Sequence, residues 1–401
     1  MPKYMSMNYH RKGADLLRKI LIIMGRYLPG YKDGGPVRSI KNLTDRLGKE
    51  YEFYILTADR DHGDTQSYTV TYPELKLQVR EWNDVGNAKV FYVEPGGFDA
   101  QTIKELAKPM DMVYMCGCFN DYARTTLWLK KKGEIRCKVV IAAMGLFSPG
   151  AFRIKYPKKK AYTMLLRWLG YFKDVEWSAT DEKEATDIRK QIGKNAICHL
   201  AEDLPRKPEK IVHETTTDKG SLRVIFLSRI SRKKNLLFAI KILQGITEGH
   251  ITFDIYGNKE DPNYWKECEQ ELEKLPDNIV WSYKGVADAE RVVDIFSKYD
   301  VFLFPTMAEN YGHVIFEAMA GGCVPVISDR TPWNSEKTKN ALSCIKLEDD
   351  EETLKLFAEE IGKFMNLSKE GMQNRADACM IFADCYRADD AEMQYRNILN
   401  G

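Results

Sequence analysis

The fold of this chain is most clearly indicated by residues 222–243, which read LRVIFLSRISRKKNLLFAIKIL. Residues 223–227 predict a buried strand and residues 236–243 predict a helix, with a basic turn between them. The same alternation continues in predicted strands at 251–256, 279–283, 301–304 and 324–327 and predicted helices at 264–275, 289–298 and 314–320. Strands that alternate with helices predict an α/β fold whose sheet is mainly parallel and covered on both faces.

The preceding half of the chain has a weaker form of this pattern. It contains predicted strands at 19–24, 52–56, 90–93, 112–114 and 139–142 and predicted helices at 37–47, 101–107 and 121–132. Residues 202–220 are polar and proline-containing, as is typical of a linker. We therefore expect a first Rossmann-like domain at 1–203, a second at 204–380, and a C-terminal helix at 381–401 that packs back on the first domain.

Composition excludes several classes of protein. Of 401 residues, 44% are hydrophobic and 29% charged, which is ordinary globular usage. The 60 basic and 58 acidic side chains leave a formal charge of +2. We therefore expect no overall positive electrostatic potential of the kind that attracts nucleic acid. No apolar run approaches the roughly 20 residues that span a bilayer, and we expect a cytoplasmic protein. Nine cysteines without a CxxC pair predict reduced packing residues rather than disulfides or zinc ligands.

A glycine-rich loop follows the first predicted strand. Gly34 and Gly35 stand directly before Pro36 and a predicted helix. Glycine allows close approach of the backbone to a ligand, and the helix N-terminus offers free N–H groups to a phosphate. A tight turn explains the two glycines equally well.

A basic turn follows the strand at 223–227. Arg229 has a planar guanidinium whose N–H donors can bind two phosphate oxygens at once, and Lys234 has a flexible side chain with a compact positive charge. The two together suit a diphosphate bound at a helix N-terminus. A solvated run of charge is the alternative. The position at the carboxyl end of a predicted strand favours binding, because ligands of such sheets collect at that edge.

The most specific motif is residues 309–317, ENYGHVIFE, followed by AMAGGCVPV. Glu309 falls in a turn after a predicted strand, and Glu317 lies on a helix among apolar neighbours, where a carboxylate without a partner is costly. The free N–H groups from Tyr311 onward would face phosphate, and His313 could donate to it. The alternative is two surface glutamates and a structural histidine.

These motifs together resemble the signature series of retaining glycosyltransferases of family 4. The resemblance implies a GT-B fold with two Rossmann-like domains facing a cleft, of which the first, 1–203, would bind the acceptor and the second, 204–380, the nucleotide sugar. It also implies a nucleotide-sugar donor that we expect to be UDP-linked, and no metal or other cofactor. By position, Arg229, Lys234 and Glu309 would be catalytic. The remaining substrate and nucleotide contacts would come from Gly34, Gly35, Tyr256, Gly257, Val286, Asn310, Tyr311, Gly312, His313 and Glu317.

One departure from the family pattern concerns the first domain. Many relatives carry a histidine near the sugar in the middle of this domain, whereas residues 143–150, AMGLFSPG, contain none. The loop at 59–62 is polar and could face the cleft, although we favour a solvated loop.

The acceptor is indicated only indirectly. Basic residues 155–160 precede an aromatic stretch at 162–172, which suits either an anionic membrane surface or a buried helix. The expected acceptor is a glycan or a polyprenyl-diphosphate-linked sugar, as in bacterial polysaccharide assembly. A nucleotide-sugar epimerase and a non-catalytic glycan- or nucleotide-binding subunit are the alternative functions.

Overall fold

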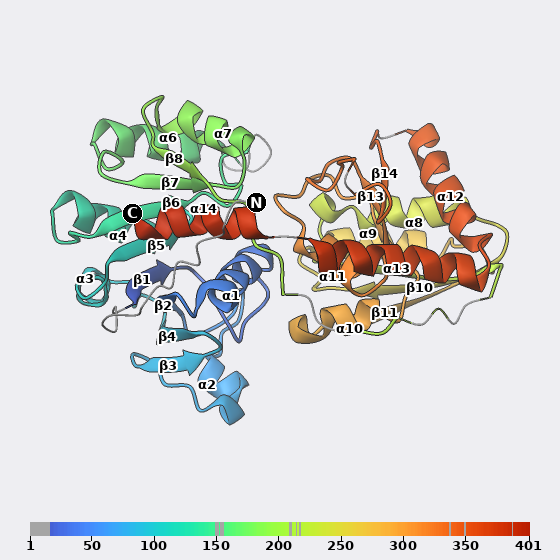
Figure 1. Ribbon diagram of the computed structural model, residues 1–401, viewed down its shortest axis with the longest axis horizontal. Helices are drawn as coiled ribbons and strands as arrows, with labels where there is room; N and C mark the ends of the chain where they lie inside the picture. Colours follow the sequence, from blue (N-terminus) through green and yellow to red (C-terminus); the bar gives the residue numbers. More distant parts are fainter. Residues whose placement is uncertain are drawn as a thin grey trace, which may run out of the picture.

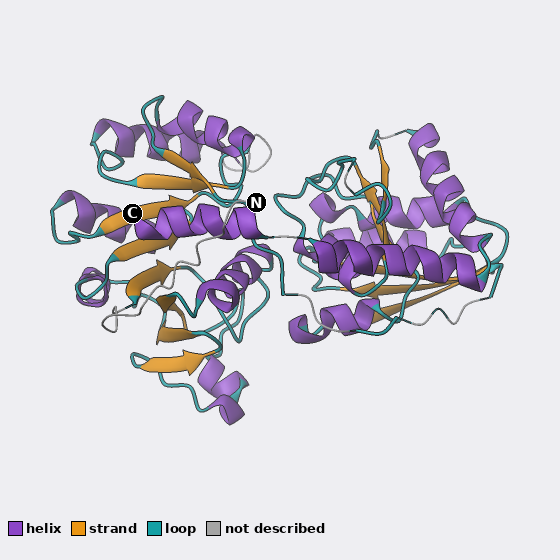
Figure 2. Cartoon of the chain, viewed as in Figure 1, coloured by secondary structure: helices purple, strands orange, loops and turns teal. Residues whose placement is uncertain are grey.

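The computed structural model describes residues 17–148, 152, 156–207, 211–213, 215, 218–336, 338–348, 350–386 and 388–401. They form two α/β domains, each with helices packed around a central sheet (Figures 1 and 2). This confirms the α/β fold class and the two parallel sheets expected from the sequence. Lys155 of the predicted membrane-facing stretch, and linker residues 208–210, 214, 216 and 217, lie outside the described residues.

The N-terminal domain contains a sheet in the order β3-β4-β2-β1-β5-β6-β7-β8. Its strands are β1 (Arg18–Ile23), β2 (Tyr51–Ala58), β3 (Trp82–Val85), β4 (Ala88–Val93), β5 (Met112–Cys116), β6 (Lys138–Ala142), β7 (Glu176–Ala179) and β8 (Cys198–Leu200). Neighbouring strands are parallel except for the antiparallel pair β3 and β4. In β1, Ile20 and Ile22 join one hydrophobic core while Leu21 and Ile23 join the other, because successive side chains point to opposite faces.

The C-terminal domain contains a fully parallel sheet in the order β11-β10-β9-β12-β13-β14. Its strands are β9 (Ser221–Leu227), β10 (His250–Tyr256), β11 (Ile279–Gly285), β12 (Val301–Phe304), β13 (Val324–Ser328) and β14 (Ser343–Ile345). All four residues of β12 and all five of β13 are buried, as expected for strands covered on both faces.

Helices cover both sheets. In the N-terminal domain they are α1 (Gly35–Leu47), α2 (Tyr68–Thr71), α3 (Ala100–Ala107), α4 (Asp121–Lys131), α6 (Tyr156–Trp168) and α7 (Glu182–Ile192). The later helices are α8 (Leu236–Gln244), α9 (Pro262–Leu272), α10 (Val292–Phe296), α11 (His313–Ala320), α12 (Glu351–Met365), α13 (Lys369–Cys385) and α14 (Asp389–Asn400). Short 3₁₀ turns occur at Pro73–Leu75, Arg232–Lys234 and Ala289–Arg291.

The chain returns to the N-terminal domain at its C-terminal end. Helix α13 extends to Cys385, beyond the boundary expected at 380, and α14 then lies across the N-terminal domain (Figure 1). Tyr395, Ile398 and Leu399 are buried in the same core as Ile20 and Ile22 of β1. Helix α14 therefore ties the two domains together through hydrophobic packing.

Each sheet has one point where the strand order reverses. In the N-terminal sheet β1 is flanked by β2 and β5, and in the C-terminal sheet β9 is flanked by β10 and β12. Ligands of open α/β sheets bind in the crevice outside the carboxyl ends of the strands at such a switch point. The loops after β9 and β12, and those after β1 and β5, are therefore the places to look for binding sites.

Candidate active site

The loops after β9 and β12 bring a lysine and a glutamate together. Lys234 Nζ donates to Glu309 Oε1 at 2.6 Å, and the two side chains are only 12% and 8% exposed. The Thr306 hydroxyl donates to the same carboxylate oxygen at 2.9 Å. Two residues that lie 75 positions apart in the sequence thus form one buried ion pair at the switch point.

Further hydrogen bonds hold these two loops in register. The Asn235 side-chain amide donates to the Pro305 carbonyl at 3.0 Å, and the Met307 N–H donates to the Lys233 carbonyl at 2.9 Å. Asn235 has a left-handed backbone with φ of 64°, a conformation that asparagine tolerates better than most residues. Lys234 and Glu309 are therefore positioned by backbone contacts on both sides as well as by their own attraction.

The two cations of the basic turn differ in environment. Burial lowers the pKa of Lys234, and the neighbouring Glu309 carboxylate opposes that shift. Arg229 stays nearer the surface, with a side chain 39% exposed and its Nη1 at 3.2 Å from both carboxylate oxygens of Glu260. Because an exposed pair of this kind is weak, the Arg229 guanidinium can exchange Glu260 for an anionic ligand.

The glycine loop of the N-terminal domain faces Arg229. A Cβ added to Gly34 would lie 3.6 Å from Arg229 Nε, and Gly34 has a φ of 66° that disfavours other residues. Gly35 begins α1, and a Cβ there would meet no atom within 4 Å. Farther along the same interface, Asn310 Oδ1 lies 3.3 Å from the position of a Cβ on Gly145. Both domains therefore contribute to the site.

Glu317 has a partner that the sequence did not reveal. Arg38 of α1 forms an ion pair with its carboxylate, and the Ser39 hydroxyl lies 3.1 Å from His313 Nε2. Burial raises the pKa of Glu317 while Arg38 acts in the opposite direction. Burial, with a smaller effect of Arg38, lowers the pKa of His313 to about 3, so its ring is neutral. Glu317, one of the predicted substrate and nucleotide contacts, is thus held by an arginine from the opposite domain.

The remaining predicted residues lie at the ends of β10 and β11 and in the turn before α11. Val286 follows β11 and is 65% exposed, whereas Tyr311 is buried and its carbonyl accepts a 2.6 Å hydrogen bond from Trp333 Nε1. The Tyr256 hydroxyl lies 3.3 Å from that of Tyr299. A Cβ on Gly257 would lie 1.7 Å from the Ser228 carbonyl oxygen, so glycine is required there for packing of the turns. Gly312 precedes α11 with a φ of 81°.

The loop at 59–62 is a correction to the sequence interpretation. Asp59 and Asp61 are buried rather than solvated. Asp61 Oδ2 accepts hydrogen bonds from the N–H groups of Tyr31 and Lys32 at 3.0 and 3.1 Å, so this carboxylate supports the glycine loop. The signal was present in the sequence, because a carboxylate after β2 lies beside the loop that follows β1 in a parallel sheet.

A second contact between the domains also went unpredicted. The Tyr31 hydroxyl donates to Glu290 Oε1 at 2.9 Å, and Arg206 of the linker approaches Glu290 Oε2 at 3.4 Å. Nothing in the local pattern around Glu290 distinguishes it from other surface glutamates.

Within the described part of the chain, no group of three or more His, Cys, Asp and Glu side chains is arranged to hold a metal ion. None of the helices in the described ranges is long and apolar enough to cross a membrane.

Comparison with known proteins identifies the class of the C-terminal domain. Residues 208–376 match the family model described as "Glycosyl transferases group 1". The chain is 26% identical over 250 residues to an uncharacterized 41.2 kDa protein in the cps region of Klebsiella pneumoniae, covering 60% of this chain and 65% of that protein. It is 27% identical over 142 residues to a glycogen synthase of Fusobacterium nucleatum, covering 34% of this chain and 30% of that enzyme. The matches therefore span less than two thirds of either relative.

Solved structures extend the similarity to nearly the whole chain. HepE of Anabaena in complex with UDP and glucose superposes with a TM-score of 0.66 at 14% identity, covering 96% of this chain and 99% of that one. At this identity the likeness concerns the fold alone. The chain has the GT-B fold, and residues 208–376 of its C-terminal domain are similar to the glycosyl transferases group 1 family.

Proposed function

We propose that this chain is a retaining, metal-independent glycosyltransferase that moves a sugar from a nucleotide donor, UDP-linked, to a hydroxyl of a glycan or lipid-linked acceptor. The observation that carries the proposal is the buried Lys234–Glu309 ion pair at the switch point of the C-terminal sheet, with Arg229 of the same basic turn lying opposite Gly34 of the other domain. The family match of residues 208–376 and the UDP complex of HepE support it.

Departure of the nucleoside diphosphate governs the proposed reaction. The bond between the anomeric carbon and the diphosphate oxygen breaks, so negative charge develops on the leaving group. Arg229 and Lys234 stand where preorganised cations would stabilise that charge, and Glu309 would accept hydrogen bonds from the donor sugar. The acceptor oxygen then bonds to the same face of the carbon, and its proton passes to the leaving diphosphate.

Recognition of the nucleotide would use the second glutamate. Arg38 contacts one carboxylate oxygen of Glu317, Oε2, and no hydrogen bond within the described residues uses Oε1. That oxygen would accept from a ribose hydroxyl, with Arg38 fixing the orientation of the carboxylate. The neutral ring of His313 and the N-terminus of α11 lie beside it.

A nucleotide screen tests the donor assignment. Thermal unfolding would be measured with UDP, GDP, ADP, CMP and NAD, since a ligand at 100 times its dissociation constant stabilises by about 2.7 kcal/mol. We expect UDP to raise the midpoint by several degrees in the wild type and not in Arg229→Ala. A response to NAD alone, or to none of the five, would contradict the proposed donor site.

Product analysis tests the reaction itself. Incubation of a UDP-sugar with and without acceptor, followed by NMR of the anomeric proton, distinguishes retention from inversion and transfer from epimerisation. Activity unchanged by EDTA is the result expected of a metal-independent enzyme. Glu309→Gln should bind UDP but transfer no sugar, whereas unchanged turnover in this variant would favour a role outside catalysis.

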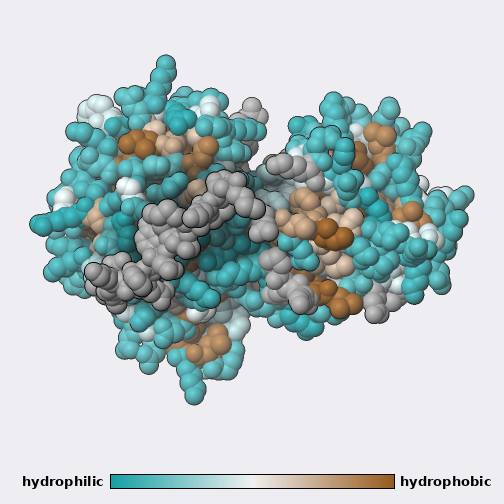
Figure 3. Space-filling view, viewed as in Figure 1, coloured by the Kyte–Doolittle hydropathy of each residue, from teal (hydrophilic) through white to brown (hydrophobic). Residues whose placement is uncertain are grey.

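We also propose that α6 meets an anionic membrane surface that holds the acceptor. Three large apolar side chains of α6 are exposed, Met164 at 60%, Leu165 at 52% and Trp168 at 82%, on a helix that begins with a lysine run. Figure 3 shows that most of the visible surface is hydrophilic, with limited brown apolar patches. Sedimentation with vesicles containing phosphatidylglycerol should capture the wild type at low salt and not Trp168→Glu; equal capture of both would overturn this part.

A further inference from the structure

A glutamate of the C-terminal domain covers one end of the Arg229 guanidinium. Arg229 Nη1 lies 3.2 Å from both carboxylate oxygens of Glu260, which belongs to the turn after β10. The Nε end lies near the other domain, because a Cβ on Gly34 would be 3.6 Å from it. Within the described part of the chain, Nε and Nη2 donate no hydrogen bond. Arg229 therefore stands between Glu260 and the glycine loop.

Backbone hydrogen bonds keep Glu260 beside Arg229. The Ile230 N–H donates to the Asn258 carbonyl at 2.8 Å, and Ile230 forms an isolated parallel bridge with Lys259. The Glu260 N–H donates to the same Asn258 carbonyl at 2.9 Å. The turns after β9 and β10 are thus joined at the residues next to Arg229 and Glu260, so the two charged side chains stay within reach of each other.

The residues on either side of Glu260 have contacts of their own. Lys259 Nζ lies 4.0 Å from the ring centroid of Trp265 and 4.1 Å from that of Tyr283. The Asp261 carboxylate accepts hydrogen bonds from two N–H groups in the first turn of α9 and so caps that helix. Among the residues that the structure describes, the Glu260 carboxylate has the arginine as its sole hydrogen-bond and ion-pair partner. These contacts assign Glu260 a role at the arginine rather than in the fold.

The two ion pairs of the candidate active site differ in exposure. The Lys234 and Glu309 side chains are 12% and 8% exposed, so separating them would leave buried charge without a partner. Those of Arg229 and Glu260 are 39% and 47% exposed, and water can solvate both charges when they part. An incoming phosphate can therefore replace Glu260 at Arg229 while the buried pair stays intact.

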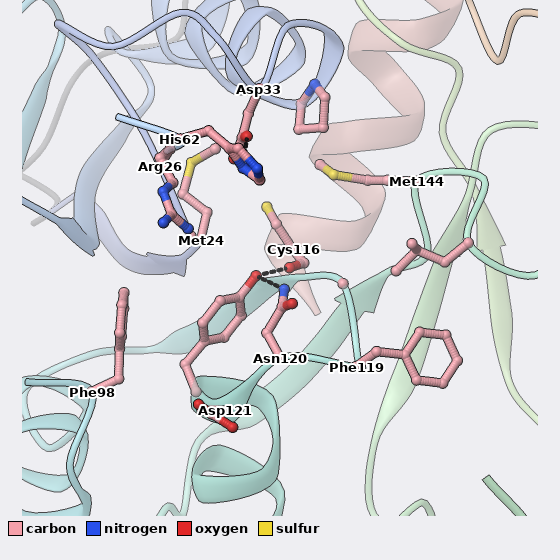
Figure 4. A pocket seen from close by; sticks show the side chains of 15 residues that line it. Met24, Arg26, Asp33, His62, Phe98, Cys116, Phe119, Asn120, Asp121 and Met144 are labelled. Carbon is pink, nitrogen blue, oxygen red and sulfur yellow. Dashed lines mark hydrogen bonds and ion pairs between the residues drawn. The ribbon is translucent and has the colours of Figure 1, made fainter. Parts of the chain in front are cut away.

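The carboxylate of the glycine loop has a partner elsewhere. Asp33 Oδ1 lies 3.1 Å from His62 Nδ1, and both residues line a cavity of about 580 Å³ in the N-terminal domain (Figure 4). Asp33 is thus held by a residue of its own domain. An anion that binds Arg229 meets its competitor in Glu260.

We propose that Glu260 competes with the diphosphate of the nucleotide for Arg229, and so weakens the binding of both the sugar donor and the released nucleoside diphosphate. When the diphosphate enters, its oxygens take the forked N–H donors of the guanidinium, whose geometry matches an oxyanion, and the carboxylate turns to solvent. A carboxylate that remains close by still repels the diphosphate. Weaker binding speeds release of the product, the step that limits turnover in many enzymes. This inference rests on the proposed function and names a residue that sets the affinity of its donor site.

Titration calorimetry with UDP tests the competition. Glu260→Gln removes the charge and keeps the size of the side chain. UDP should bind this variant about twofold to fivefold more tightly than the wild type, the factor that corresponds to the strength of an exposed ion pair. Unchanged or weaker binding of UDP by Glu260→Gln would overturn the inference.

Glu267→Gln is the matched control. Glu267 pairs with Arg232 of the same basic turn, where Arg232 Nη1 lies 3.0 Å from Glu267 Oε2, and the two side chains are 59% and 44% exposed for the arginine and the glutamate. This variant also removes one negative charge near the basic turn, but it leaves the pair at Arg229 in place. UDP affinity should stay close to that of the wild type. An equal gain in Glu267→Gln would assign the effect to net charge and contradict the competition at Arg229.

Thermal unfolding without ligand checks that Glu260 has no structural role. The midpoints of Glu260→Gln and the wild type should agree within about 4 °C, because an exposed ion pair adds little stability. A larger fall, or failure of the variant to fold, would assign Glu260 to the fold and overturn the inference.

The same titrations separate this inference from the proposed function. If UDP binds the wild type and Glu260→Gln equally well, the competition is refuted and the donor site stands. If UDP binds neither protein, the donor site itself is refuted.

Discussion

Replacing Lys234 by methionine tests the ion pair at the centre of the candidate active site. Methionine keeps much of the volume of the lysine stem and removes the charge. The Glu309 side chain, which is only 8% exposed, would then lose its cation and keep the hydrogen bond from the Thr306 hydroxyl. Breaking a buried pair by removing one member costs about 3–5 kcal/mol. At about 2–4 °C per kcal/mol for a domain of this size, the unfolding midpoint should fall by about 6–20 °C.

A double-mutant cycle makes this prediction specific. Lys234→Met with Glu309→Gln should recover part of the loss, because the unpaired charge is then absent. Midpoints from calorimetry would be compared for the four proteins. A single variant that melts within about 1 °C of the wild type, or strict additivity in the cycle, would refute the buried pair.

Three further predictions concern the domain interface and α14. Arg38→Ala leaves Glu317 buried without its cation, so the midpoint should fall by several degrees, and more at higher pH; an unchanged midpoint would contradict this. Burial raises the pKa of Asp203 from 3.8 to about 7, so the destabilisation by its ionised form grows as pH rises from about 4 to about 7 and is complete above that. The gain in midpoint of Asp203→Asn over the wild type should therefore be larger at about pH 8 than at about pH 5. Tyr395→Ala should lower the free energy of unfolding by about 3–5 kcal/mol, against less than about 1 kcal/mol for Arg396→Ala, as measured by urea titration.

The sequence predicted the strands that lie in the middle of the sheets. β1, β9 and β12 contain runs of large apolar residues, and burial on both faces imposes such a composition directly. The edge strands β3 and β14 were missed, because each is short and partly exposed and has no such composition, whereas the seven-residue edge strand β11 was predicted. β7 and β8 were missed for a similar reason, with four and three residues.

The candidate site was predictable where its residues follow a strand. Arg229, Lys234 and Glu309 come after β9 and β12, and the rule that ligands collect at the carboxyl edge selects them.

By itself the sequence determined the alternation of strands and helices, the two-domain organisation and the identity of the polar turns, because these depend on local periodicity and on residue type. The tertiary structure decided which side chains pair across long separations. Lys234 with Glu309, Arg38 with Glu317 and Asp61 with the glycine loop are such pairs. The physical reason is that pairing energy depends on distance and burial, and both are fixed only when the sheets and the two domains have packed.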